Sequence, residues 1–231
     1  MLEITRYSLQ MALIYLLRHA ESSANVAGIL AGRTKGISLS KRGSAQSREL
    51  ARALKAFEFR AIYSSPLERC LETIEPFASS TGKKVKLAKE FIEMDYGLWS
   101  GRKLNSLRRE KLWKKIQKSP SQVRFPEGES FAELARRIKF GMNMLTEKHH
   151  RGGVLVVSHG DPIKLAISIT LGLEVDEFQK LVVDPASLTI IDWPNGTLLS
   201  ANVPLAGKIG SKGESKKKLA NRRVLGGGTN A

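Results

Sequence analysis

Residues 12–17, ALIYLL, form an uninterrupted apolar run that polar residues follow at once. A strand covered on both faces of a parallel sheet has this pattern, because no position along it faces water. A second run of this kind covers residues 154–158, and short strands are also expected over residues 61–65 and 84–88. Helix-forming segments alternate with these runs. The sequence therefore predicts an α/β fold, a three-layer α/β/α sandwich around a mostly parallel central sheet.

The helices expected between these strands have recognisable starts. The capping-box pattern S-x-x-E occurs at residues 65–68, before a helix through about residue 79. It occurs again at residues 130–133, before a helix through about residue 148. Both patterns predict where a helix begins, and the first would place Arg69 in the first helical turn.

The remaining elements follow from periodicity and turn residues. Amphipathic helices are expected over residues 40–55 and 162–171, the second with Asp161 as its cap. Residues 187–193 and 197–203, joined by a Pro-Asn-Gly turn, predict a terminal hairpin.

Residues 102–124 are basic and helix-prone, with Trp113 and Ile116 as apolar anchors, and no strand pattern occurs before residue 150. We expect a helical insertion at about 102–150 over one edge of the sheet, within one domain over residues 11–206. The basic residues of the insertion either form a solvated helix face or line the entrance for a multiply anionic substrate.

The net charge of the chain is +16, from 38 Lys and Arg against 22 Asp and Glu. Residues 207–231 hold seven basic residues and one acid, and they lack hydrophobic periodicity. This composition predicts a basic, disordered tail. Nucleic acid is not expected as a partner except through this tail.

Composition also bears on the compartment. No apolar run approaches the roughly 18 residues of a membrane span, and residues 1–17 lack the features of a signal peptide. The single cysteine, Cys70, excludes an internal disulfide and fits a reducing environment. We expect a cytoplasmic protein without a membrane partner, in which Cys70 is a buried helix residue. Oligomeric state and the choice between Met1 and Met11 as the start stay open.

Three of the predicted strands are followed by residues that bind anions. The first strand delivers Arg18 and His19, the second leads to Arg69, and the fourth leads to His159. Ligands of open α/β sheets bind outside the carboxyl ends of the strands. Two arginines and two histidines at this edge predict a site for a dianion, most simply a phosphate.

Neither a metal nor a cofactor is expected. No H-x-x-x-H or D-x-D spacing occurs near these residues, and an arginine beside a metal ion is electrostatically unfavourable. The phosphate-loop and dinucleotide-binding glycine motifs are also absent from the sequence.

Four segments carry a family resemblance: "RHAES" with Asn25, "SSPLERCLET", "EMDYGLWSGR" and "VVSHGD". In this order they resemble the signature segments of the histidine phosphatase superfamily, which has the phosphoglycerate mutase-like fold. The resemblance runs from about residue 12 to 192. "FPEGES" and "VVDPAS" are most similar to an actinobacterial phosphomutase-like branch. One departure is Ala20, where the commonest first motif of the family has glycine.

The resemblance implies a role for each matching residue. His19 would be the nucleophile that becomes a phosphohistidine. Arg18, Arg69 and His159 would hold the phosphoryl oxygens, with Asn25 as a further contact, and His159 would also take part in catalysis.

Glu93 matches the general acid or base of the family, and the neighbouring Asp95 is a second candidate for this role. A carboxylic acid suits this task because it can protonate the leaving alkoxide and then activate water.

The implied activity is a metal-independent phosphomonoesterase that acts on a small phosphorylated metabolite. A phosphoglycerate mutase-type phosphotransfer is the alternative, since both reactions share these residues. The segment between Glu93 and His159 is shorter than in cofactor-dependent mutases, and a shorter cover admits water, which favours hydrolysis. Two less favoured functions also stay open, a phosphohistidine-protein phosphatase and an RNA-binding scaffold that uses the basic tail.

Overall fold

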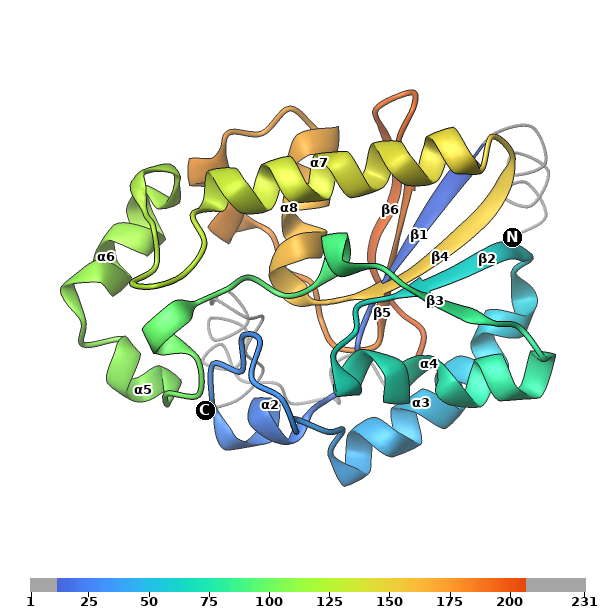
Figure 1. Cartoon of the computed structure of the whole chain (residues 1–231), viewed down its shortest axis with the longest axis horizontal. Coiled ribbons are helices and arrows are strands. Elements are labelled where there is room, and N and C mark those ends of the chain that lie inside the picture. Colours follow the sequence, from blue (N-terminus) through green and yellow to red (C-terminus); the bar gives the residue numbers. More distant parts are fainter. Residues whose placement is uncertain (1–11, 207–231) are drawn as a thin grey trace, which may run out of the picture.

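The computed structural model describes residues 12–206, and its centre is a six-stranded sheet with the order β3-β2-β4-β1-β5-β6 (Figure 1). Strands β1 to β4 run parallel, whereas β5 is antiparallel to β1 and β6 is antiparallel to β5. The mostly parallel sheet and the terminal hairpin are thereby confirmed. The strands are β1 (Ala12–Arg18), β2 (Phe59–Ser64), β3 (Val85–Leu87), β4 (Gly152–Ser158), β5 (Ser187–Asp192) and β6 (Thr197–Pro204).

Helices cover both faces of the sheet, which confirms the three-layer architecture (Figure 1). One face is covered by α3 (Lys41–Ala53) and α4 (Glu68–Thr81), and the other by α7 (Phe131–Lys148) and α8 (Gly160–Thr170). Strand β1 shows why its sequence is apolar throughout. Tyr15 packs with the core under α3 and α4, whereas Leu16 packs with the core under α7 and α8.

The shorter helices lie in the connections. They are α2 (Ser23–Ala27), α5 (Leu104–Leu107) and α6 (Lys111–Lys118), together with the 3₁₀ turns Leu54–Ala56, Lys89–Phe91, Gly97–Trp99, Pro120–Gln122 and Val175–Lys180. Trp113 and Ile116 of α6 are buried as expected, and Trp113 stacks on Trp99. The 102–150 insertion stays a prediction. Within it, α7 contributes to the core directly over the sheet.

Two of the predicted helix starts are wrong, and a third is confirmed. Helix α4 begins at Glu68 without a side-chain cap, because the hydroxyl of Ser65 lies 2.7 Å from Nε2 of His159 instead. At α8 the cap position belongs to His159, and Asp161 lies in the first turn. The capping box of α7, formed by Ser130 and Glu133, is present as predicted.

Within the part of the chain that the structure describes, no helix has both the length and the apolar character to cross a bilayer. The predicted basic tail, residues 207–231, lies outside the described residues.

Candidate active site

Strand pairing brings the predicted site residues together. Arg18 and Ser158 are register partners at the ends of β1 and β4, and the amide of His19 donates to the carbonyl of Ser158 at 2.9 Å. The His19 and His159 rings consequently lie with their centroids 5.2 Å apart. On the other side of β4, the amide of Ser65 donates to the Val157 carbonyl, so α4 starts beside the same edge. Arg69, on its first turn, reaches the site from there.

His19 is held in the form that a nucleophile requires. Its Nδ1 lies 2.7 Å from the carbonyl oxygen of Ala20, and because a carbonyl only accepts, Nδ1 carries the hydrogen. The lone pair is therefore on Nε2. Burial lowers the pKa of His19 well below its usual value, and the charges of Arg69 and Arg18 lower it further. The imidazole stays neutral, and its lone pair stays available at physiological pH.

Ala20, the departure from the commonest motif, fits without strain. Its amide donates to Oγ1 of Thr73 on α4 at 2.9 Å, and its methyl group is fully buried. The residue thus links the segment after β1 to α4, next to His19.

Two buried guanidinium groups supply positive charge. Arg18 is 0% exposed and donates from Nη1 to the carbonyl of Val183 at 2.6 Å, and burial is the main cause that lowers its pKa. Arg69 is 1% exposed and donates from Nη2 to the carbonyl of Gly32 at 2.8 Å. Its Nη1 is buried and has no hydrogen-bond partner within residues 12–206. A buried donor left in this way favours an anion beside it.

The structure distinguishes the two carboxylate candidates. Glu93 lines the cavity, and burial, followed by the charge of Asp161, raises its pKa to about 7. Asp95 is partly exposed, bonds Arg33 at 3.3 Å and accepts the amide of Gly97 at 2.9 Å. Its carboxylate is thus used to shape the loop that follows Glu93, and it does not line the cavity.

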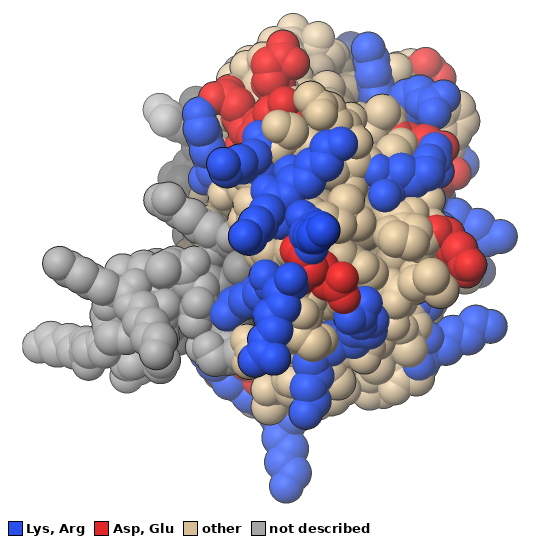
Figure 2. Space-filling model, turned by 90° about the vertical axis from the view of Figure 1, so that its left-hand side faces the viewer, with Lys and Arg blue, Asp and Glu red and all other residues tan. Residues whose placement is uncertain are grey.

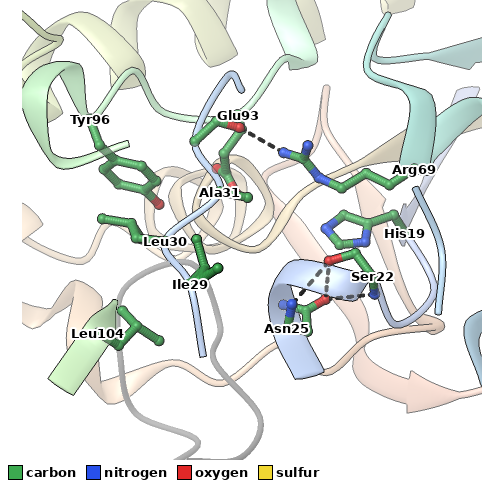
Figure 3. Close-up of a pocket in the computed structure, with 11 residues that line it drawn as sticks. His19, Ser22, Asn25, Ile29, Leu30, Ala31, Arg69, Glu93, Tyr96 and Leu104 are labelled. Atoms are coloured by element: carbon green, nitrogen blue, oxygen red, sulfur yellow. Dashed lines mark hydrogen bonds between the residues drawn. The ribbon is translucent and has the colours of Figure 1, made fainter. Parts of the chain in front are cut away.

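The cavity lies between His19, Arg69 and Glu93 (Figure 3). Its volume of about 20 Å³ is room for one water molecule. The other lining residues form a mixed wall, polar on one side and apolar on the other: Ser22, Asn25, Tyr96, Ile29, Leu30, Ala31, Gly32 and Leu104.

Arg18 and His159 lie at the same end of the sheet but do not line this cavity. His159 is fully buried, with Nε2 2.7 Å from Oγ of Ser65 and 3.4 Å from Sγ of Cys70. Burial lowers the pKa of His159 well below its usual value, and the neighbouring cations add to this, so the ring is neutral. Cys70 is a buried residue of α4, as expected.

Asn25 lines the cavity, but its carbonyl oxygen is already used. Oδ1 accepts the amide of Ser22 at 3.0 Å and its hydroxyl at 2.9 Å, which forms the capping box of α2 (Figure 3). The Nδ2 amide is the group that remains for a phosphate oxygen.

Sequence reasoning missed the apolar side of the cavity. Residues 29–32 form its wall because backbone hydrogen bonds tie them to the segment before α5: the Leu30 amide donates to Arg102 and the Gly101 amide donates to Leu30. The signal for this turn was a pair of glycines, Gly28 and Gly32, which both have positive φ.

Basic side chains cover the surface outside this wall, on the end of the molecule that carries α5 and α6 (Figure 2). Lys103, Arg109, Lys111, Lys114 and Lys115 are exposed there. Within residues 102–115, the cavity is lined by Leu104 and not by the basic side chains. The basic side chains of this run are therefore exposed and do not line the cavity, and their place at a substrate entrance stays a prediction.

Comparisons with known proteins agree with this geometry. Residues 14–202 match the family model of the histidine phosphatase superfamily (branch 1). The chain is 32% identical to phosphoserine phosphatase 1 of Hydrogenobacter thermophilus, over 78% of this chain and 86% of that one. It is also 32% identical to a 2,3-bisphosphoglycerate-dependent phosphoglycerate mutase of Thermoplasma acidophilum, over 82% and 92%.

A solved structure extends the likeness to three dimensions. The α-ribazole phosphatase from Shigella flexneri superposes with a TM-score of 0.73 at 27% identity, covering 86% of this chain and all of that one. The narrower resemblance to an actinobacterial branch stays a prediction. Because the family model spans nearly all of the described residues, the chain belongs to the histidine phosphatase superfamily, whose chemistry is phosphate-ester hydrolysis or phosphotransfer through a histidine.

Proposed function

We propose that this protein is a metal-independent phosphomonoesterase that acts on a small phosphorylated metabolite through a phosphohistidine at His19. The observation that carries the proposal is the bond from Nδ1 of His19 to the Ala20 carbonyl. It leaves Nε2 as the nucleophilic atom of a neutral imidazole, next to buried Arg69 and a carboxyl group whose pKa is raised to about 7.

In the first step, Nε2 of His19 attacks phosphorus in line, and the bond from phosphorus to the ester oxygen breaks. Glu93 gives its proton to the leaving alkoxide and becomes a carboxylate. The guanidinium groups of Arg18 and Arg69 stabilise the charge on the equatorial oxygens. The Nδ2 amide of Asn25 and the ring of His159 complete the set of phosphate contacts.

In the second step, the Glu93 carboxylate takes a proton from water, whose oxygen attacks phosphorus. The P–N bond breaks, inorganic phosphate leaves, and His19 and Glu93 return to their starting forms. A pKa of about 7 suits both steps, because the group then gives and takes a proton with similar ease near neutral pH.

Phosphotransfer to a second alcohol is the other candidate, since one relative is named a phosphoglycerate mutase. Hydrolysis is favoured because one relative and one similar solved structure are named phosphatases.

The substrate, the domain limits and the compartment belong to the same proposal. Relatives named phosphoserine phosphatase and α-ribazole phosphatase support a small phosphorylated substrate. We assign residues 11–206 to the histidine phosphatase domain, with about 102–150 as its insertion. The buried Cys70, whose thiol pKa burial raises to about 12, fits the reducing cytoplasm.

The test is hydrolysis of p-nitrophenyl phosphate in the presence of EDTA, with trapping of an acid-labile phosphoenzyme. His19→Ala should abolish both turnover and labelling, whereas His149→Ala, at the end of α7, should retain both. Activity that survives His19→Ala, or that EDTA removes, would overturn the proposal. Incubation with 3-phosphoglycerate distinguishes the two reactions, since a mutase forms the 2-isomer and a phosphatase releases phosphate.

A further inference from the structure

A lysine and an aspartate are buried one helical turn apart in α8, behind the active site. Asp161 and Lys164 are both 0% exposed, and Nζ of Lys164 lies 3.9 Å from Oδ1 of Asp161. The ammonium group also lies 4.7 Å from the centre of the Phe178 ring. Among residues 12–206, neither Nζ nor Oδ1 has a hydrogen-bond partner. Such a pair gains little stability from its own attraction, because burying two charges is costly.

The other oxygen of Asp161 connects the pair to the cavity. Oδ2 accepts a hydrogen bond from the hydroxyl of Tyr96 at 2.6 Å, and the Tyr96 ring lines the cavity together with Glu93 (Figure 3). The charge of Asp161 also raises the pKa of Glu93, so the two carboxyl groups interact electrostatically. The buried pair therefore acts on the proposed general acid.

The charges around Glu93 come from several elements and oppose one another. Arg69 on α4 and Arg18 at the end of β1 lower the pKa of Glu93, as does the Met94 amide that bonds its Oε1 at 2.9 Å. Burial and Asp161 raise it.

Three further cations face this residue. Arg33 and Arg137 bond the Glu93 backbone carbonyl, at 3.0 and 3.5 Å, and Lys164 interacts with Glu93 electrostatically across the buried region. Since His19 is neutral, the positive charge next to Glu93 comes mainly from the two arginines that a phosphate needs. These arginines favour loss of the proton that Glu93 must donate, and the charge of Asp161 acts together with burial to oppose them.

We propose that Asp161, held by Lys164 and Tyr96, is a positioning residue that keeps the proton on Glu93 in the resting enzyme. Lys164 faces Oδ1 of Asp161 and the Tyr96 hydroxyl donates to Oδ2, so both groups stabilise the negative charge on this carboxylate. The negative charge then offsets the arginines and leaves Glu93 as the proton donor. This inference rests on the proposed role of Glu93.

The experiment is the pH profile of kcat/KM with two esters of similar shape, phenyl phosphate and p-nitrophenyl phosphate. Phenolate is the poorer leaving group, so its release depends more on the proton of Glu93. In the wild type, the rate with phenyl phosphate should fall as the pH rises through the pKa of Glu93. Asp161→Asn should move this falling limb to lower pH by about one unit, which is a tenfold loss above neutral pH. The loss with p-nitrophenyl phosphate should be smaller.

Lys164→Met is a second variant, for which we expect the falling limb of the pH profile to shift in the opposite direction. Removing a positive charge raises the pKa of nearby acids, so the falling limb should move to higher pH. General damage to the fold would not move one limb in opposite directions for two neighbouring residues. Asp192→Asn is the matched control: Asp192 is also fully buried, at the far end of β5, and its variant should leave the limb in place.

Glu93→Gln distinguishes a failure of the inference about Asp161 from a failure of the proposed role of Glu93. If Glu93→Gln removes the limb while Asp161→Asn and Lys164→Met leave it at its wild-type position, the inference about Asp161 is overturned and the role of Glu93 stands. If Glu93→Gln keeps the wild-type rate and profile with phenyl phosphate, the proposed role of Glu93 fails as well.

Discussion

The floor and the rim of the pocket are built in different ways. The floor consists of His19 and Arg69, which line the cavity, together with Arg18 and His159, which are buried at the same end of the sheet without lining it. These residues follow paired strands or lie at the starts of α4 and α8. The rim consists of residues 29–32, Tyr96 and Leu104, which are held by loop-to-loop backbone hydrogen bonds. The floor is fixed by the register of the sheet, so it is rigid and suits chemistry. The rim depends on turns, which can vary without disturbing the sheet, so it suits substrate choice.

This comparison predicts that changes in the floor affect the chemical step most. Arg69→Ala should lower kcat/KM for p-nitrophenyl phosphate by about 10²- to 10³-fold, because it removes a preorganised donor to the phosphoryl oxygens. Arg69→Lys should recover only part of this loss. An ammonium group keeps the charge, but it lacks the planar guanidinium geometry with which Arg69 also donates to the Gly32 carbonyl. If Arg69→Ala retains wild-type kcat/KM, Arg69 is no part of the floor.

A rim change of intermediate size is Gly32→Ala. Gly32 has φ of +51°, and a Cβ there would lie 2.5 Å from Oγ of Ser100 and 3.0 Å from the Tyr96 ring. Strain of about 1–2 kcal/mol should displace the rim and raise KM about tenfold. Phosphoenzyme formation at saturating substrate should remain.

Gly36→Ala is the control, because φ there is +74° but nothing lies within 4 Å of the added carbon. If both variants raise KM equally, backbone strain alone explains the increase, and displacement of the rim does not.

The smallest effect is expected at Leu104, the contribution of α5 to the rim. Leu104→Ala removes apolar contact with the organic part of the substrate, worth about 0.8 kcal/mol per buried methylene, so KM for phenyl phosphate should rise about threefold. Inhibition by inorganic phosphate should not change, because this ion reaches only the floor. Leu98→Ala, at an exposed leucine outside the cavity, should change neither value. A parallel rise in the phosphate inhibition constant would show that floor and rim are not separate.

The same division explains what could be predicted from the sequence. The strands, the three layers and the gathering of His19 and Arg69 were predictable, because apolar runs specify buried strands and parallel strands end at one edge. Glu93 was placed at the site by the family resemblance alone. The roles of these residues remain predictions that the experiments above address.

The errors arose where a polar side chain had two possible partners. Ser65 and Asp161 both stand at positions typical of helix caps, yet they contact His159 and Tyr96. These partners are 94 and 65 residues away in the chain, so no local sequence pattern predicts the two contacts. Lys164 carried a usable signal, as a single lysine among apolar residues of a helix, "PIKLAISI". A charge at such a position marks either a surface stripe or a buried partner, and the structure shows the second.

The burial of the two arginines has a consequence for the reaction product. Arg18 and Arg69 are buried, so a phosphate group that binds them as proposed would have little of their hydration to displace. Inorganic phosphate gains the same advantage as the ester, because both present the same oxygens to the floor. If the site hydrolyses phosphate esters as proposed, it should therefore also be prone to product inhibition. Turnover in a cell should accordingly follow the phosphate level as well as the supply of substrate.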